Sequence, residues 1–471
     1  MPSFHKPMAS RPASNACAVD GFDCFIGVEF EYLVPYIPPG KADPDPVDKR
    51  YVVMDDVETR NGESEMTREL AAALANTRLH RDFREAGLPA VVDSIVNSKI
   101  KEMEDDDEIE AKRNRYFAKQ AAEQGVPIPR DGSAVEHRFW RLNTDLSVKH
   151  DKNNTDCMGR ERYLWALPHQ SMGFDEKLGL ELASPVLRAS EAADAISAAL
   201  HTLRRSLRFV VPRSAGLHVH LSSLEGGVDL LTVKKMVSLV LLCEGVIYTM
   251  ANPWRLKSKF SASVMSALVT AQEDRETRSR TLGETGRELA VIEADRNSRL
   301  ETMHEHLPWP LRPSEKRHDA LETLWTCAGH DELRMLHSGM AVKRKADRPT
   351  EEDPDAGLYT IEMRQFEGTV DPDTTCAWVR FCAALFRIAS TGDAASYKAK
   401  MTELNNLLSH RYDNPASAFT MYTCKLEAFM QAIGLADAAQ FWRRKSDRDK
   451  VIPTLSQTCM TPTRLIPPLI W

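Results

Sequence analysis

This sequence of 471 residues lacks the features that mark several protein classes. None of its nine cysteines forms a Cys-x-x-Cys pair, which argues against a zinc ribbon and a disulfide framework. The most apolar stretch, Met236 to Met250, is interrupted by Glu244 and is too short to span a membrane. Residues 1–20 contain no continuous apolar run of the kind found in secretory signals. We therefore expect a soluble, cytoplasmic protein with no membrane partner.

The sequence also lacks an excess of positive charge. It contains 61 Lys and Arg residues against 68 Asp and Glu residues, and its formal net charge is −7. Proteins that bind nucleic acids usually need a basic patch to contact phosphates, so we expect no nucleic-acid partner. Hydrophobic residues make up 42% and charged residues 27% of the chain, which is typical of a globular protein with a sizeable core. The oligomeric state stays open.

We predict one large domain with an addition at each end. Residues 1–22, rich in Pro, Ser and Ala, are interpreted as a flexible arm. Residues 23–395 are assigned to the main domain, with a peripheral insertion at about 38–138, and residues 396–471 to a C-terminal helical extension. The acidic run at 102–110 is interpreted as a solvated helix face or loop.

Hydrophobic periodicity predicts the main elements. Strands are predicted at 24–34, 178–184, 217–222 and 359–366. Helices are predicted at 66–86, 191–208, 231–250 and 376–390, with more helices between 397 and 450. Ser190 is the predicted N-cap of the helix at 191–208. The charged segment 273–301 has helical spacing and is expected to be solvated.

Four separate strands share one pattern. Alternate residues of a strand lie on the same face, and each of these strands has one apolar face. The other faces combine small residues with Glu, His or Arg, namely Gly27, Glu29 and Glu31; Gly179, Glu181 and Ala183; Gly216, His218, His220 and Ser222; and Thr360, Glu362 and Arg364. An antiparallel sheet covered by helices on one face has this pattern. Simple solvation explains one such strand, but solvated faces favour Thr, Lys and Arg over a glycine beside a charge.

Gathered on one sheet face, these acidic residues would repel one another. Like-charged carboxylates raise each other's pKa unless a cation lies between them. Four carboxylates and one imidazole form a hard, oxygen-rich set, which suits Mg²⁺ or Mn²⁺ better than Zn²⁺. We therefore predict a metal site formed by Glu29, Glu31, Glu181, Glu362 and a histidine of the 217–222 strand.

The order of these motifs resembles the amidoligase family, a branch of the carboxylate–amine ligase superfamily related to glutamine synthetase and glutamate–cysteine ligase. The matching segments are GVEFE (27–31), Trp140–Ser147, LELASP (180–185), GLHVHLS (216–222), ANPWR (251–255) and IEMRQFEGT (361–369). The resemblance implies an α+β fold of the glutamine synthetase type. Such a fold has a curved, mainly antiparallel sheet with a polar ligand-binding face and with helices on the other face. The segment LHSGMAVKRK (336–345) matches the family poorly.

The resemblance also implies which residues bind metal. Glu31 and Glu181 would bind a metal at the substrate end of the site. Glu29, His218 and Glu362 would bind a second metal that neutralises the phosphates of ATP. The implied cofactors are ATP and Mg²⁺ (or Mn²⁺).

Other roles follow from the same resemblance. His220 and Arg255 would contact the nucleotide, and Arg364 would hold both the nucleotide and the phosphoryl group in transfer. Glu367 and Asp145 are candidates for the general base that deprotonates the amine. A structural role is equally compatible with the sequence for both, in the turn at Gly368 for Glu367 and as a local turn cap for Asp145.

The function implied is an ATP-dependent ligase that joins a small-molecule or amino-acid-like carboxylate to an amine through an acyl phosphate. A phosphotransferase acting on a guanidinium group could use the same fold. A catalytically silent metabolite-binding protein is a further alternative, although all five ligands and Arg364 are present. A zinc hydrolase using His218 and His220 would lack the His-Glu-x-x-His helix or an equally specific motif.

Overall fold

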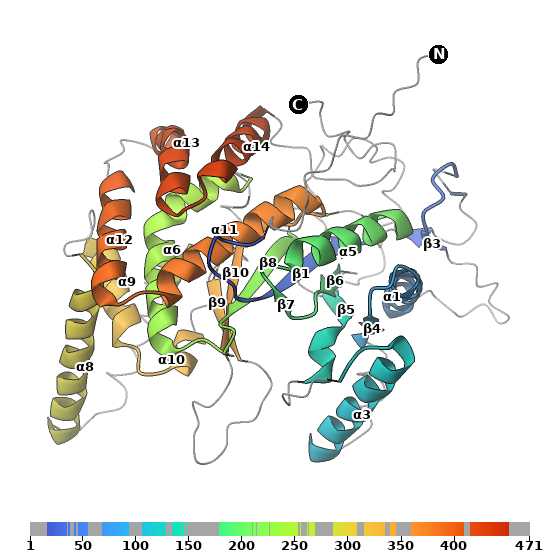
Figure 1. The fold of residues 1–471 in the computed structure, drawn as a ribbon, viewed down its shortest axis with the longest axis horizontal. Coiled ribbons are helices and arrows are strands. Elements are labelled where there is room, and N and C mark those ends of the chain that lie inside the picture. The colour runs from blue at the N-terminus through green and yellow to red at the C-terminus, as the bar shows by residue number, and fades with distance from the viewer. Residues whose placement is uncertain are drawn as a thin grey trace, which may run out of the picture.

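The structure of the protein is a computed structural model, drawn in Figure 1. It describes residues 17–34, 36–37, 42–43, 46–54, 68–93, 106–128, 134–145, 148, 179–209, 211–212, 214–225, 227–252, 255, 261, 263–268, 286–308, 315–334, 340–344, 359–408 and 415–451. Residues 1–16 of the predicted arm, 273–285 of the charged segment and 452–471 of the C-terminal extension lie outside these ranges.

The described strands form one large sheet and one small one. The large sheet has eight strands in the order β4-β5-β6-β1-β8-β10-β9, with β7 also paired to β1. These strands are β1 (Phe25–Leu33), β4 (Ala90–Val92), β5 (Trp140–Asp145), β6 (Gly179–Ala183), β7 (Leu187–Arg188), β8 (Gly216–Ser222), β9 (Met340–Arg344) and β10 (Tyr359–Glu367). All neighbours are antiparallel except β4 and β5. The small sheet pairs β2 (Tyr36–Ile37) with β3 (Val53–Met54) in parallel. The predicted α+β class and mostly antiparallel sheet are confirmed.

Helices lie along one face of the large sheet and next to both of its edges. Their bounds are α1 (Arg68–Glu85), α3 (Asp106–Gln124), α5 (Ala192–Ser206), α6 (Leu230–Met250), α8 (Gly286–His306), α9 (Glu315–Thr326), α10 (His330–Arg334), α11 (Pro372–Ser390), α12 (Ala394–Leu408), α13 (Pro415–Ala432) and α14 (Ala439–Val451). In Figure 1, α5 and α11 run along the sheet, α1 and α3 lie near β4, and α6, α12, α13 and α14 stand together at the other end. None of the described helices combines the length and apolar character needed to cross a bilayer.

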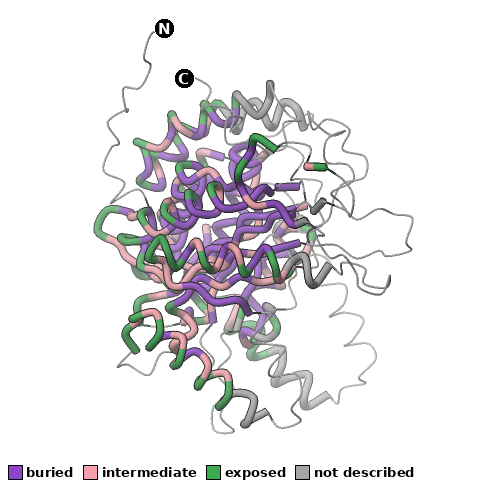
Figure 2. Tube along the Cα trace, turned by 90° about the vertical axis from the view of Figure 1, so that its right-hand side faces the viewer, coloured by how far each residue is buried: buried purple, intermediate pink, exposed green. Residues whose placement is uncertain are grey.

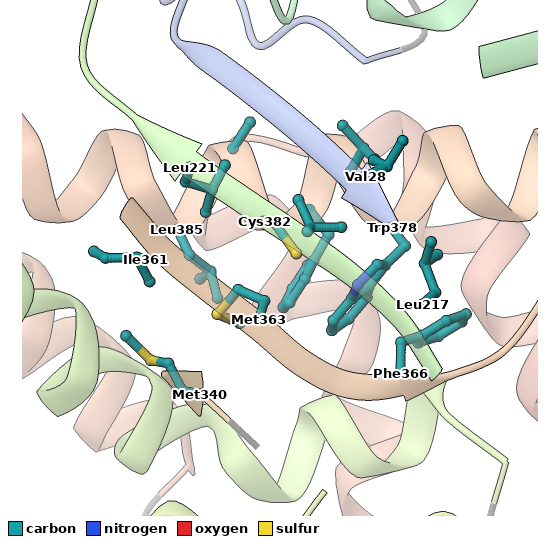
Figure 3. Packing of buried hydrophobic residues seen from close by; sticks show 14 of the residues in the cluster. Val28, Leu217, Leu221, Met340, Ile361, Met363, Phe366, Trp378, Cys382 and Leu385 are labelled. Carbon is teal, nitrogen blue, oxygen red and sulfur yellow. The ribbon is translucent and has the colours of Figure 1, made fainter. Parts of the chain in front are cut away.

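The apolar face of the large sheet packs on α11. Val28, Leu221 and Met363 come from three neighbouring strands, and each is at most 1% exposed. Figure 3 shows side chains from these strands gathered against Trp378, Cys382 and Leu385 of α11. Buried residues fill the middle of the molecule and exposed ones lie on its outer helices (Figure 2). The face that the sequence predicted to be apolar is thus the core face.

Local capping fixes where the central helices begin. The N-caps Asp229 of α6 and Asp371 of α11 accept hydrogen bonds from the backbone N–H three residues later, at 2.8 and 2.9 Å. The predicted N-cap Ser190 is wrong, because Glu191 occupies that position without a side-chain cap. The Ser190 hydroxyl donates instead to Asp23 Oδ2 at 3.1 Å, which ties the start of α5 to the chain before β1.

The predicted domain boundaries stay predictions, but the described parts of the arm, the insertion and the C-terminal extension all contact the rest of the structure. Cys17 and Val19 of the predicted arm are buried, and the Ala18 carbonyl accepts a hydrogen bond from Arg380 of α11. Within 38–138, β4 extends the large sheet and α1 packs on α5. In the C-terminal part, α13 and α14 both pack on α6.

The packing of α11 can be tested with a matched pair of truncations. Leu385 of α11 is 0% exposed and Leu231 of α6 is 38% exposed. Leu385→Ala leaves a cavity and should lower the free energy of unfolding by about 2–5 kcal/mol. Leu231→Ala should change it by about 0.5 kcal/mol or less. Urea unfolding followed by circular dichroism measures both, and equal losses would contradict this arrangement of α11.

Candidate metal centre

The polar face of the large sheet brings the five predicted metal ligands together. Directly opposite residues of antiparallel strands lie on the same face. The opposite pairs are Glu31 and Glu181, Glu29 and His218, and His220 and Glu362. The strands β6, β1, β8 and β10 therefore present these side chains side by side, on the face turned away from the apolar core.

The first group of ligand atoms comes from Glu29, His218 and Glu362. One ligand atom from each residue lies within 4.8 Å of the other two. His218 Nδ1 lies 3.1 Å from Glu29 Oε2 and 3.3 Å from Glu362 Oε1. The side chains of His218 and Glu362 are only 4% and 2% exposed, so water screens their charges weakly. These are the three residues predicted to bind the second metal.

The second group comes from Glu31, Asp145 and Glu181, whose ligand atoms also lie within 4.8 Å of one another. The Asn143 amide donates to Glu181 Oε1 at 3.1 Å, and the Gly216 N–H donates to Glu31 Oε2 at 2.7 Å. Asp145 was predicted as a candidate base, and the structure places it with the two ligands predicted for the substrate-end metal. Three carboxylates thus meet at one point of the sheet.

His218 lies between the two groups. Its Nε2 is 3.4 Å from Glu31 Oε1 in the second group, while its Nδ1 faces Glu29 in the first. A neutral imidazole has one N–H, so one of its nitrogens directs a lone pair toward a carboxylate. A cation placed between that lone pair and the carboxylate would remove the repulsion.

Burial and neighbouring charges shift the proton affinities of the site. Burial, followed by repulsion from Asp145, raises the pKa of Glu31 well above its usual range. Burial, followed by repulsion from Glu29, raises the pKa of Glu181 to about 8. Burial opposes ionisation of Glu29 as well, but the two histidines outweigh it and hold its pKa well below the usual range. Burial lowers the pKa of His220, yet the Glu29 carboxylate outweighs burial and raises it to about 9.

Divalent cations fit both groups. The second group offers only carboxylate oxygens, and the first offers two carboxylates and one imidazole. Such oxygen-rich sets are typical of Mg²⁺ and Mn²⁺ sites. Burial first, and a neighbouring carboxylate second, raise the pKa of Glu31 and of Glu181, and a bound cation would stabilise their ionised forms.

Three basic side chains border the first group. His220 Nε2 lies 3.0 Å from Glu29 Oε1. Arg364 and Lys343 approach Glu362 from two strands, with Arg364 NH1 3.5 Å from Oε1 and Lys343 Nζ 3.4 Å from Oε2. The Nε of Arg364 is buried and has no hydrogen-bond partner among the residues that the structure describes. The Arg364 side chain as a whole is 23% exposed, so its outer N–H groups can donate to an anionic ligand.

Arg255, which the resemblance assigned to the nucleotide, is buried and bonds to the backbone. The residue is 0% exposed. Its guanidinium donates to the backbone carbonyls of Ser214, Ala215 and Arg364, at 3.4, 3.3 and 3.0 Å. These bonds indicate that Arg255 braces the ends of β8 and β10, and its contact with the nucleotide stays a prediction.

Glu367 is separated from the other predicted residues by a bulge in β10 between Met363 and Phe366. Its carboxylate accepts hydrogen bonds from Lys445 Nζ at 2.6 Å and from the Asn252 N–H at 2.9 Å. Since both oxygens are occupied and the residue is 4% exposed, Glu367 is poorly placed to take a proton from a substrate. These contacts favour the structural role that the sequence left open for Glu367, and its role as general base stays a prediction.

The family model described as "Putative amidoligase enzyme" matches residues 26–386, which is most of the chain. The chain belongs to the amidoligase family. A comparison with curated proteins found no significant match. The matched range contains every residue of the two ligand groups, and membership of the family indicates an amide-bond ligase.

Three residues of this amidoligase family member were missed by sequence reasoning. Asn143 lies two positions before Asp145 on β5, so the period of a strand could have placed it on the same face. Lys343 lies in the segment that matches the family poorly, and only the pairing of β9 with β10 brings it to Glu362. No pattern in the sequence indicated the contact between Lys445 and Glu367, because the two residues are 78 positions apart.

The raised pKa values predict how stability depends on pH. Glu181, with a pKa of about 8, and His220, with a pKa of about 9, both hold protons more tightly in the folded chain than in the unfolded chain. Folding therefore binds protons, and the melting temperature of the metal-free protein should fall as pH rises from about 6 to about 9. Mg²⁺ needs the ionised carboxylates, so the stabilisation it provides should grow over the same range.

Melting curves with EDTA and with excess Mg²⁺ measure both trends. Glu181→Gln should flatten the metal-free trend. The control Glu427→Gln should keep it, because Glu427 is on α13 and its side chain is 77% exposed. A metal-free melting temperature that rises with pH would contradict the assignment.

Proposed function

We propose that this chain is an ATP-dependent carboxylate–amine ligase with a glutamine synthetase-type catalytic fold. It would use Mg²⁺ or Mn²⁺ and act in the cytoplasm on small-molecule or amino-acid-like substrates. The γ-phosphoryl group of ATP moves to the carboxylate of the substrate, and the resulting acyl phosphate is attacked by an amine. Formation of the amide then releases phosphate, with ADP as the other product.

One observation carries the proposal: two groups of three metal-ligating side chains lie side by side on one sheet face. A single acidic cluster would be compatible with many functions. Two adjacent groups joined by His218, with a row of basic side chains beside one of them, suit phosphoryl transfer between two bound substrates. The amidoligase family membership of residues 26–386 supports the same reaction class.

The protein's part in this reaction is positioning and charge neutralisation. Glu29, His218 and Glu362 would hold one divalent cation, and Glu31, Asp145 and Glu181 the other. When bound, such cations neutralise phosphate oxygens and the charge that develops on the transferred group. We assign Asp145 to the cation rather than to proton transfer, because its carboxylate lies within ligand distance of Glu31 and Glu181.

Arg364 would contact the phosphoryl group. Its side chain is 23% exposed, and its NH1 lies 3.5 Å from Glu362 Oε1. The planar guanidinium can donate to two phosphoryl oxygens at once, whereas an ammonium acts as a point charge. His220, beside Glu29, would lie next to the same phosphates.

The reaction can be tested without knowing the substrates. The pure protein would be incubated with ATP, Mg²⁺ and pools of carboxylates and amines, and the products analysed by mass spectrometry. Dehydrative adducts formed together with ADP and phosphate support a ligase. A phosphorylated guanidino compound would identify a phosphotransferase instead, and the absence of any ATP-dependent product would overturn the proposal.

Glu181→Ala should abolish amide formation while leaving a folded protein that binds ATP. Leu180 and Leu182 are buried on the other face, so this truncation should cost little packing energy. It also relieves repulsion in the metal-free protein, so the melting temperature without metal should stay unchanged or rise. Activity and melting curves are measured together, with Glu427→Ala as the exposed control. A lower melting temperature combined with substantial residual activity would refute the metal-binding role of Glu181.

Arg364→Lys should lower turnover by about a hundred- to thousandfold, as expected when one charge-stabilising donor is lost. ATP binding should weaken much less, because the positive charge remains. Steady-state kinetics and equilibrium binding of ATP separate the two effects. Equal losses in both would instead indicate that Arg364 acts mainly as the ion-pair partner of Glu362.

A further inference from the structure

Lys343 of β9 is a basic side chain of the site to which neither the motifs nor the family membership assign a role. β9 is the edge strand of the large sheet, and its register places Lys343 opposite Thr360 and Ala341 opposite Glu362. The Lys343 side chain crosses toward β10, and its Nζ lies 3.4 Å from Glu362 Oε2. Half of the side chain remains exposed, so its ammonium can also meet a ligand from solvent.

The charges around Glu362 indicate what kind of ligand this is. Lys343 and Arg364 balance Glu29 and Glu362 even before any positive charge on the histidines is counted. A divalent cation bound by the two carboxylates would therefore leave the group with at least two positive charges. A partly buried, net positive group is stabilised by an anion, and a polyphosphate with several negative charges balances it best.

Lys343 suits a phosphate contact better than a purely structural one. An ion pair that is half exposed contributes little to stability, typically about 1 kcal/mol or less. Glu362, only 2% exposed, already has Arg364 and His218 within 3.5 Å. Lysine donates three hydrogen bonds from a long stem, which suits a phosphate chain that lies over the edge of a sheet.

We infer that Lys343 is a positioning residue that binds the phosphate chain of the nucleotide beside the group formed by Glu29, His218 and Glu362. This inference rests on the proposed function for the identity of the nucleotide. The binding of a polyphosphate beside a divalent cation can be tested without a nucleotide, by using inorganic tripolyphosphate.

Lys343→Met removes the charge but keeps most of the stem, and Lys343→Arg keeps the charge. In the full-length protein, Lys343→Met should weaken binding of Mg–ATP and of Mg–tripolyphosphate by about ten- to a hundredfold, the usual effect of losing one hydrogen bond to a charged group. Binding of Mg–AMP should change about twofold or less, since AMP lacks most of the chain. Lys343→Arg should bind all of these ligands like the wild type. Lys119→Met, on α3 with a side chain that is 73% exposed, is the matched control.

Binding of Mn²⁺ alone distinguishes this role from a structural one. Lys343 repels a cation near Glu362, so Lys343→Met should bind Mn²⁺ as tightly as the wild type or more tightly, while it binds Mg–ATP more weakly. Calorimetry for all ligands and melting curves without ligand provide the readouts. Loss of Mn²⁺ and Mg–ATP binding together, with a lower melting temperature, would show that Lys343 is structural and overturn the inference.

The outcomes also separate this inference from the proposed function. Unchanged Mg–ATP and Mg–tripolyphosphate binding in Lys343→Met would overturn the inference and leave the ligase proposal standing. A wild-type protein that binds both ligands through Lys343 but forms no amide would support the inference and sink the ligase proposal. A wild-type protein that binds neither ligand would overturn both.

Discussion

Charge compensation on the polar face of the large sheet is the constraint on which the site depends. Glu31 and Glu362 are 4% and 1% exposed, and a buried carboxylate is costly unless it has a partner. The protein provides partners unevenly. The cationic side chains Arg364 and Lys343 border the first group, together with His220. In the second group, Glu181 accepts from the Asn143 amide, and Glu31 accepts from the Gly216 N–H and faces His218 Nε2.

The need to compensate these charges also explains contacts at the ends of β8 and β10, away from the ligands. Arg255 and the ion pair between Glu367 and Lys445 hold the neighbouring ends of β8 and β10, where the Arg255 guanidinium donates to the carbonyls of Ala215 and Arg364. A side chain at Gly216 would meet Arg255 NH2 and His218 Nε2, each 2.7 Å from the added carbon. Because residue 216 is a glycine, Arg255, His218 and Glu31 can all approach the same point of the backbone. The C-terminal helix α14 contributes to the site through Lys445, although it carries no ligand.

The sequence was sufficient to predict the two faces of the sheet, because a strand alternates its side chains with a period of two. That rule predicted that Glu29, Glu31 and Glu181 share a face, and the register confirms it. The rule fails across the bulge in β10, so Glu367 could not be located by counting from Glu362. Contacts between distant segments, such as Lys343 with Glu362, depend on strand order, which alternation alone does not determine.

The two ligand groups cannot behave independently, because His218 contacts both. Its Nδ1 faces Glu29 and Glu362, and its Nε2 faces Glu31. A cation that binds the lone pair of one His218 nitrogen fixes the proton on the other nitrogen. The carboxylates of the opposite group then face an N–H instead of a lone pair. The same strand β1 carries Glu29 and Glu31 two positions apart, so a shift of either residue moves the other. Filling one group should therefore alter the affinity of the second, and substitutions in the two groups should not be additive.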